Sequence, residues 1–300
     1  MAMPYFPLTP TADGSATFFS ETFGEWFHSR QGAYAEARNI YVQATNLVPR
    51  ALQQDRITIL DVCYGLGYNT AAALEGIWAV KPQAHIQLVG LELNEAVPRA
   101  AISQGLIKDW PPPVQAALID LAKTQQIRTH LQADLLIGDA RQHVQTLANA
   151  GLQADVIFLD PFSPPRCPQL WTVEFLTLVA RCLQPQGVLV TYSCAAAVRT
   201  ALQLAGLQIG SLAVRDRQWP STLASYDDTN LQPLSQQEQE HLRTRAAVPY
   251  RDPSLQDDAE TIQQRRVQEQ ATSSLQSTGA WRRRWLTRIE PEKAEKTGHK

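Results

Sequence analysis

Five short apolar runs, separated by segments with helical spacing, limit the possible folds of this chain more than any other feature of its sequence. The runs are residues 57–62, 86–92, 134–138, 155–160 and 187–193. Each has the length of a strand and stays apolar throughout, which is typical of parallel strands covered by helices on both faces. The alternation therefore predicts an α/β fold built on a mostly parallel sheet.

The segments between and after these runs complete the expected sheet. The helical segments expected between them are 69–80, 94–107, 141–150 and 171–183. Apolar spacing predicts a further helix within 28–48, and three prolines interrupt 109–130, which we interpret as an inserted element. Two more strand candidates, 207–214 and 221–226, are separated by a short polar turn, so an antiparallel pair is expected at the sheet edge. The sheet would then hold seven strands.

Composition divides the chain into three parts. Residues 1–55 form an N-terminal substrate-side segment, 56–230 carry the alternating strands and helices, and 231–300 form a polar extension. The final part, 281–300, has seven Lys/Arg against three Glu, a local charge of +4. This composition favours a solvated, partly disordered tail. The alternative is an RNA-binding arm, because Arg and Trp supply phosphate contacts and stacking surfaces.

Charge and cysteine usage narrow the class of protein. The 300-residue chain has a net charge of −2, so no global field favours nucleic acid or membrane, and no stretch of about 18 apolar residues is present. The N-terminus lacks the basic start and apolar core of a signal peptide. Cys63, Cys167, Cys182 and Cys194 lack metal-ligand spacing. We expect reduced thiols, no bound metal and a cytoplasmic location.

Candidate ligand-binding residues follow the expected strands. Ligands of an open parallel sheet bind beyond the carboxyl ends of its strands. Gly65 and Gly67 follow the first run and allow a tight turn before a helix. Glu92 ends the second run and suits two ribose hydroxyls, Asp139 follows the third and suits an adenine amino group, and Asp160 ends the fourth. One such acid is commonly a helix cap, but four successive strand ends favour an adenosine-bearing cofactor.

The loop after the first run distinguishes among such cofactors. Cys63 stands at the first glycine position of a GxGxxG motif, and the loop lacks the lysine of a phosphate-binding P-loop. The pattern Asp-x-x-x-Gly-x-Gly, which begins at Asp61, therefore fits S-adenosylmethionine better than a dinucleotide. Asp61 is the candidate for an electrostatic role toward the ammonium group of that cofactor.

An Asp-Pro-Phe turn after the fourth run suggests the chemistry. Asp160 and the Pro161 carbonyl suit hydrogen bonds to an amine, and Phe162 suits packing on a base or a cation. An alkyl amine, with a pKa of roughly 10, is mostly protonated at neutral pH. Burial would lower that pKa, and Asp160 or water would accept the proton. The alternative for this stretch is a rigid loop that caps the helix at Trp171.

Several segments carry a family likeness. They are TADGSATFFSETFGEWFHSRQGAYAEA, DVCYGLGYNT, IGDAR, VIFLDPFSPPRCPQLWT, LVTYSCAAAVRTAL and RQWPSTLA. Over residues 9–227 their order and spacing resemble the methyltransferase domain of the MnmC family, bacterial enzymes that make 5-methylaminomethyl-2-thiouridine at the tRNA wobble position. The resemblance implies a Rossmann-like, class I S-adenosylmethionine-dependent methyltransferase fold.

The resemblance also implies a substrate and a set of contacts. Methyl transfer is expected to the primary amine of 5-aminomethyl(-2-thio)uridine in the tRNA anticodon loop. Cofactor contacts are expected at the glycine loop, Glu92 and Asp139, and substrate contacts at 160–162. His28 and Arg30 would lie near the mouth of the site. The base must leave the anticodon stack to reach a recessed amine site.

The chain also departs from the family pattern. Cys63 replaces the first glycine of the family loop. A second glycine fingerprint for a flavin-dependent oxidase domain is absent, so we expect only the methyl step, with upstream wobble-uridine modification enzymes supplying the aminomethyl substrate. Two alternatives remain: an amine methyltransferase or aminopropyltransferase acting on a small molecule, and a non-catalytic RNA-binding protein. Cofactor binding separates the last from the others, and substrate size separates the first two.

Overall fold

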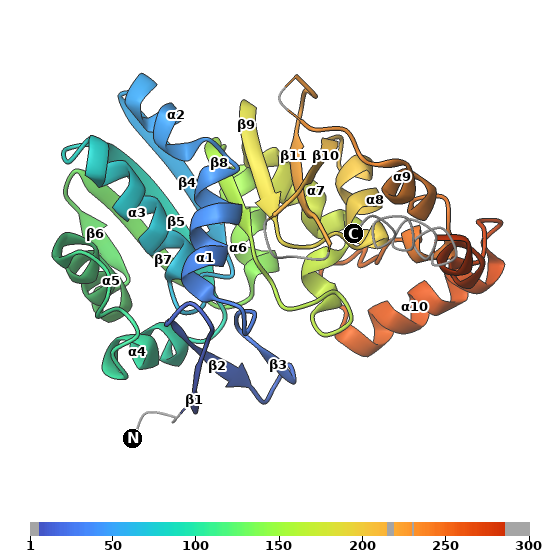
Figure 1. The fold of residues 1–300 in the computed structure, drawn as a ribbon, viewed down its shortest axis with the longest axis horizontal. Coiled ribbons are helices and arrows are strands. Elements are labelled where there is room, and N and C mark those ends of the chain that lie inside the picture. Colours follow the sequence, from blue (N-terminus) through green and yellow to red (C-terminus); the bar gives the residue numbers. More distant parts are fainter. Residues whose placement is uncertain (1–5, 215–218, 230, 286–300) are drawn as a thin grey trace, which may run out of the picture.

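The central feature of the fold is one large sheet. The computed structural model describes residues 6–214, 219–229 and 231–285. The strands of the sheet are β4 Arg56–Val62, β5 His85–Glu92, β6 Gln126–Arg128, β7 Leu131–Ile137, β8 Ala154–Leu159, β9 Leu183–Thr191, β10 Gln208–Leu212 and β11 Ser221–Ser225. Their order is β10-β11-β9-β8-β4-β5-β7-β6 (Figure 1). The five strands from β9 to β7 are parallel, and β6, β10 and β11 are antiparallel additions at the two edges.

This sheet confirms the predicted α/β class and the antiparallel pair at one edge. It has eight strands within the described residues, however, and not the seven expected. The additional strand is β6, which lies in the segment interpreted as an insertion and pairs with β7. It has only three residues and no apolar run, so periodicity gave no signal for it.

Helices cover both faces of the sheet (Figure 1). They include α3 Tyr68–Val80, α4 Ala96–Ser103, α5 Pro112–Thr124, α6 Ala140–Asn149, α7 Val173–Arg181 and α8 Ala196–Leu204. Ile57 and Ile59 pack in the core beneath α3, α4 and α5, whereas Leu60 and Val62 pack in the core beneath α6, α7 and α8. Side chains of a strand alternate between faces, which explains why the central strands are apolar at almost every position.

The N-terminal part supplies a small second sheet and several short helices. The small sheet consists of β1 Leu8–Pro10, β2 Ala16–Ser20 and β3 Glu25–Trp26. The single helix expected within 28–48 is divided into α1 Ala33–Glu36, a π-helix η1 Ala37–Gln43 and the start of α2 Leu47–Gln53. Asn46 has φ 52° and interrupts the helical path before α2. Helix η1 packs against α3 and β9, which brings its buried side chains to the carboxyl ends of the strands.

The C-terminal extension folds back onto the sheet domain. It contains α9 Gln236–His241, η3 Arg245–Ala247 and α10 Ala259–Thr272. Arg199 of α8 pairs with Glu238 of α9 at 2.8 Å, and Tyr250 forms a bridge with Thr172, so residues 231–285 contact the sheet domain directly. A solvated, partly disordered tail is the prediction for 281–300, and residues 286–300 of it lie outside the described residues. The contacts between the extension and the domain are individual ion pairs and buried side chains, which overall composition does not reveal.

None of the helices in the described ranges is both long and apolar enough to cross a membrane.

Candidate active site

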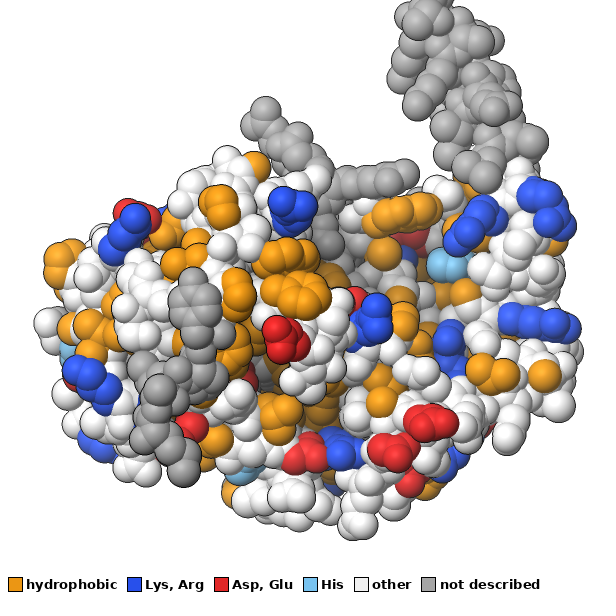
Figure 2. All heavy atoms as spheres, turned by 90° about the horizontal axis from the view of Figure 1, so that it is seen from below, with side chains coloured by type: hydrophobic (Ala, Val, Ile, Leu, Met, Phe, Trp, Pro, Cys, Tyr) orange, Lys and Arg blue, Asp and Glu red, His pale blue; other side chains and the backbone are white. Residues whose placement is uncertain are grey.

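A cavity of about 850 Å³ lies where the strand order reverses. Strands β5 and β8 flank β4 on opposite sides, which makes β4 and β8 the switch point where open sheets bind ligands. The cavity is lined by residues that follow β4, β5, β7, β8 and β9, and by residues of the N-terminal sheet. Figure 2 views the side of the molecule that carries the small sheet, and hydrophobic side chains gather around the hollow in this face.

The loop after β4 keeps a glycine-like turn despite its cysteine. Cys63 has φ 71°, close to the values of 56° at Gly65 and 81° at Gly67. A non-glycine residue in this left-handed conformation costs about 1–2 kcal/mol. Cys63 therefore occupies the conformation that the missing glycine would favour. Gly65 lines the cavity, whereas Gly67 supports the loop from behind, where a Cβ would lie 2.7 Å from the Tyr64 hydroxyl.

Glu92 joins this loop to the end of β5. Its Oε2 accepts a hydrogen bond from the Gly65 amide at 2.8 Å, and its Oε1 accepts one from the Asn94 amide at 2.9 Å. Burial raises the pKa of Glu92, although these amide donors oppose the effect. Each carboxylate oxygen retains acceptor capacity after one hydrogen bond. Glu92 lines the cavity and so suits the pair of ribose hydroxyls expected for it.

Asp139 is both a helix cap and a cavity residue. It is the N-cap of α6, and its Oδ1 accepts from the Arg141 amide at 2.9 Å. The Arg141 guanidinium also contacts both carboxylate oxygens, at 2.7 Å to Oδ2 and 3.2 Å to Oδ1. Burial alone would raise the pKa of Asp139, but the hydrogen bonds and charge of Arg141 hold it below its usual value. Asp139 therefore presents an ionised acceptor to the cavity.

Asp61 lies elsewhere than the sequence pattern indicated. It shares a strand face with Ile57 and Ile59, and its Oδ2 accepts from the Thr70 hydroxyl of α3 at 2.7 Å. It does not line the cavity, and its Oδ1 lacks a hydrogen-bond partner among the described residues. Burial raises the pKa of Asp61 to about 7. Asp61 therefore contacts α3 beneath the loop, and not the space expected for an ammonium group.

The turn after β8 is fixed by three side chains that the sequence did not single out. Tyr41 of η1 donates to Asp160 Oδ1 at 2.5 Å, and Asn69 of α3 donates to Oδ2 at 2.8 Å. Tyr192 donates to the Pro161 carbonyl at 2.8 Å. Burial raises the pKa of Asp160 well above its usual range, and the charge of a neighbouring glutamate, Glu36, adds to the effect. The cavity thus contains a basic, firmly held carboxylate.

Aromatic side chains from the N-terminal sheet pack on the same turn. Phe162 stacks on Phe23 with ring centroids 4.5 Å apart and meets Phe27 edge-on at 5.0 Å. Glu25 of β3 accepts hydrogen bonds from the Ser163 amide, at 2.9 Å, and from its hydroxyl. All five residues line the cavity, so the N-terminal part and the strand ends build one wall together.

His28 and Arg30 both line the cavity, as expected from their place in the N-terminal block. His28 is buried, and burial lowers its pKa to about 4, so its ring is neutral at pH 7. It lies edge-on to Tyr68 at 4.9 Å. Arg30 is exposed. The two residues therefore differ in character: one shapes the wall and the other supplies a positive charge at the surface.

The described residues offer no group of three or more His, Cys, Asp or Glu side chains arranged to hold a metal ion. Cys63 and Cys167 line the cavity as free thiols, and burial raises the pKa of both. Protonated thiols are weak nucleophiles and weak ligands. The carboxylates and aromatic rings thus dominate the chemistry of this cavity.

Comparisons with known proteins agree with this geometry. A family model described as S-adenosyl-L-methionine-dependent methyltransferase matches residues 98–227. The crystal structure of MnmC2 from Aquifex aeolicus superposes with a TM-score of 0.79 at 29% identity, covering 90% of this chain and 86% of that one. An uncharacterised protein of Methanocaldococcus jannaschii is 30% identical over 83% of this chain and 68% of that protein.

The MnmC proteins themselves are longer. The tRNA 5-methylaminomethyl-2-thiouridine biosynthesis bifunctional protein MnmC of Azoarcus is 28% identical over 227 residues, which cover 69% of this chain and 34% of that protein. This chain therefore spans about a third of that relative's length. From the strand-end cavity and these similarities together, we conclude that the chain belongs to the MnmC-like family of S-adenosyl-L-methionine-dependent methyltransferases.

Proposed function

We propose that this methyltransferase acts on the primary amine of 5-aminomethyl(-2-thio)uridine at the wobble position of tRNA. The observation that carries the proposal is the Asp160–Pro161–Phe162 turn, which Tyr41, Asn69 and Tyr192 hold at the cavity wall. The names of the similar MnmC proteins contain 5-methylaminomethyl-2-thiouridine, which is the product of this methyl transfer, and so support the same assignment. Enzymes that install the aminomethyl group would act before this one.

The residues present fit S-adenosyl-L-methionine. The cavity of about 850 Å³ is large enough for the cofactor together with a substrate group. The loop at Gly65, the buried carboxylate of Glu92 and the ionised carboxylate of Asp139 lie in chain order along its wall. We assign Glu92 to the ribose hydroxyls and Asp139 to the adenine amino group. When bound, the cofactor supplies an electrophilic methyl group on a sulfonium.

The residues of the cavity would bind the substrate ammonium group, remove its proton and position the resulting neutral amine. An alkylammonium group enters favourably, because Asp160, Glu25 and Glu36 line the cavity as acids. The ionised form of Asp160 then accepts a proton from the ammonium group, which it binds more firmly because its pKa is raised, and the Pro161 carbonyl accepts a hydrogen bond from the amine. The remaining displacement depends mainly on positioning. Tyr41 and Asn69 supply that positioning, because they fix both oxygens of Asp160.

The aromatic wall suits a nucleobase. Phe23 and Phe162, which are stacked on each other, are partly exposed and line the cavity together with the acidic group. Extruded bases bind by stacking on such rings while polar groups contact their edges. This combination favours an amine attached to a base over a simple aliphatic amine.

Labelled S-adenosyl-L-methionine tests the proposal with bulk tRNA from a strain that lacks the methyl step. Nucleoside analysis should reveal labelled 5-methylaminomethyluridine or its 2-thio form. Bulk tRNA from the parent strain, already methylated, is the matched control and should stay unlabelled. Cofactor binding with no transfer to either tRNA would reject the tRNA assignment, and transfer to small amines would then establish the alternative.

A further inference from the structure

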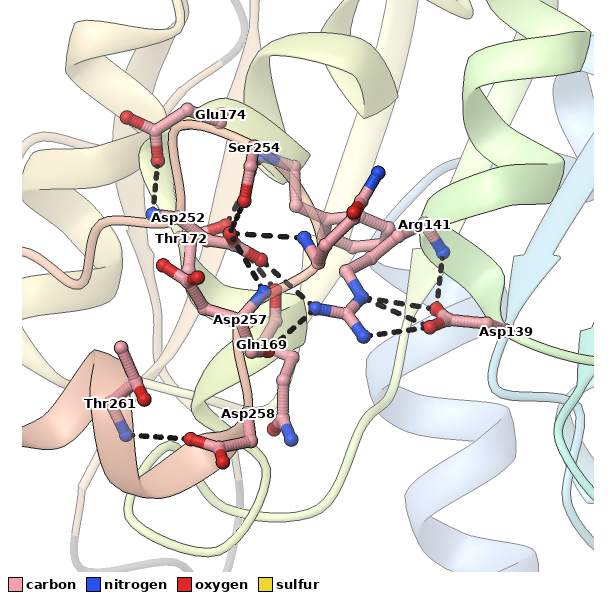
Figure 3. A network of polar contacts seen from close by, with 12 residues as sticks. Asp139, Arg141, Gln169, Thr172, Glu174, Asp252, Ser254, Asp257, Asp258 and Thr261 are labelled. Carbon is pink, nitrogen blue, oxygen red and sulfur yellow. Dashed lines mark hydrogen bonds and ion pairs between the residues drawn. The ribbon is translucent and has the colours of Figure 1, made fainter.

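Arg141 of α6 connects the C-terminal extension with the carboxylate of Asp139 at the cavity (Figure 3). The Arg141 guanidinium lies between two carboxylates, Asp139 at the cavity and Asp252 in the extension. Its Nε and Nη2 face Asp139, whereas Nη1 donates to Asp252 Oδ2 at 2.9 Å and to the Asp257 carbonyl at 2.8 Å. The extension therefore completes the hydrogen bonding of a residue that holds a cavity carboxylate.

Asp252 is fixed independently of Arg141. Its side chain is fully buried, and its Oδ1 accepts from the amides of Gln256 and Asp257 at 3.1 and 3.2 Å. Its own amide donates to Glu174 of α7 at 2.8 Å. The loop before α10 thus presents one free carboxylate oxygen toward Arg141 in a rigid orientation.

Asp139 depends more on its neighbours. Its side chain is 31% exposed, compared with 13% for Arg141 and none for Asp252. The exposed fraction of the side chain therefore increases stepwise from Asp252 in the extension, through Arg141, to Asp139 at the cavity. An acceptor held in its binding orientation before the ligand arrives loses less entropy on binding. A planar guanidinium with several donors is suited to fix one carboxylate while anchored by another.

We propose that Asp252 is a positioning residue for cofactor binding: it anchors Arg141, which orients Asp139 toward the adenine amino group of S-adenosyl-L-methionine. The inference rests on the assignment of Asp139 to the adenine and does not depend on the tRNA substrate. It makes the side chain of Asp252, in the extension, a functional part of the cofactor site.

Cofactor binding and docking of the extension are thermodynamically linked in this arrangement. If the extension improves cofactor affinity, the cofactor must stabilise the docked extension by the same factor. Protease cleavage within the extension should therefore slow when S-adenosylhomocysteine binds.

Calorimetric titration with S-adenosylhomocysteine tests the proposal on the full chain. In Asp252→Asn the single side-chain oxygen can keep the two loop amides, and the NH2 group, a donor, then faces the Arg141 donors and cannot anchor them. We expect its Kd to rise about tenfold, the range of one hydrogen bond to a charged group. In an Asp139→Asn background the same change should alter Kd less than twofold, because Asp252 acts through Asp139.

Asp257→Asn is the matched control. Asp257 lies in the same loop, but its carboxylate pairs with Arg265 at 2.7 Å and does not contact Arg141. Its Kd should match that of the unaltered protein. An unchanged Kd in Asp252→Asn, equal effects in both Asp139 backgrounds, or equal weakening by Asp257→Asn would each overturn the proposal.

Arg141→Lys provides a second variant if Asp252→Asn does not fold. Lysine keeps the positive charge but lacks the fork that contacts both carboxylates. We expect a similar rise in Kd and loss of the ligand-dependent protection against proteolysis. Unchanged affinity together with unchanged protection in this variant would contradict the proposal.

Discussion

At the scale of single residues, the Asp160 carboxyl group is the proposed general base. Its pKa is raised chiefly by burial, and hydrogen bonds from Tyr41 and Asn69 partly oppose that effect. A base with a raised pKa accepts a proton from an ammonium group more readily, but only at a pH where it is itself ionised. Both its strength and its pH range therefore depend on a few named neighbours.

Replacement of Asp160 by Asn should lower the methyl-transfer rate about 100-fold or more, the range typical of a lost general base. Its Kd for S-adenosylhomocysteine should stay within about threefold.

Tyr41→Phe removes a donor that stabilises the ionised carboxylate, so the pKa of Asp160 should rise further. The acidic limb of the pH–rate profile should then move to higher pH. An unmoved limb in Tyr41→Phe would show that another group titrates there.

Asp61 gives a separate prediction about stability. Its folded-state pKa of about 7 lies above the ordinary value of 3.8, so the folded protein binds the proton more tightly than the unfolded chain. The contribution of Asp61 to stability should therefore fall as pH rises from 4 to 7, by up to about 1.4 kcal/mol for each pH unit, whereas His28, with its pKa lowered to about 4, contributes the opposite trend. Urea denaturation should show that Asp61→Asn gains stability relative to the unaltered protein as pH rises through this window. Parallel curves for both proteins would exclude this contribution.

At the scale of elements, the segment after β8 both lines the cavity and caps the next helix, which are the two alternatives that its sequence allowed. Its first residues line the cavity, and its end begins α7, where Thr172 is the N-cap and accepts a hydrogen bond from the Phe175 amide. The capping loop and the turn proposed to be catalytic are therefore parts of one segment. The indole Nε1 of Trp171, next to the cap, donates to the Phe162 carbonyl at 2.8 Å and so joins the two ends of the segment.

Thr172→Ala should lower the free energy of unfolding by about 1 kcal/mol, the usual effect of a lost N-cap side chain. Thr172→Ser keeps the hydroxyl and is the matched control, with little change expected. Denaturant titration of both variants measures the difference. Equal loss in the two variants would assign the effect to the buried methyl group of Thr172 instead.

The sequence reveals elements more readily than the contacts between them. Strand-end residues such as Glu92 and Asp160 were predictable, because apolar runs locate the strands and topology gathers their ends. Tyr41 was not, since it contacts Asp160 across 119 residues of sequence and its helical spacing is also that of a core aromatic. Asp61 shows another limit: its place in the chain suggested the cavity, but strand alternation turns it toward α3.

At the scale of the whole molecule, the extension and the sheet domain form one folded unit over the described residues. Arg199 is almost fully buried in α8, and it contacts Glu238 at 2.8 Å and the Thr222 hydroxyl at 2.9 Å. The polar composition of 231–300 does not reveal this docking, because the ion pair joins residues 39 positions apart in sequence. Folding of the extension should therefore be cooperative with that of the domain.

Removal of one partner of this buried pair should reveal that cooperativity. Glu238→Ala leaves the Arg199 charge uncompensated and should cost about 3–5 kcal/mol of stability. The double variant Arg199→Met, Glu238→Met removes both charges and should be more stable than the single variant. Urea denaturation followed by circular dichroism measures both, with one transition expected. Separate transitions for the extension and the domain would contradict a single folded unit.

The most direct test of the central claim is the location of the transferred methyl group. Wild-type protein and Asp160→Ala are incubated side by side with trideuteromethyl-labelled S-adenosyl-L-methionine and tRNA that carries 5-aminomethyl-2-thiouridine, and digested nucleosides are analysed by mass spectrometry. The account predicts a labelled methyl group on the aminomethyl nitrogen with the wild type and almost none with the variant. A label on any other atom, or no label on tRNA despite cofactor binding, would contradict it.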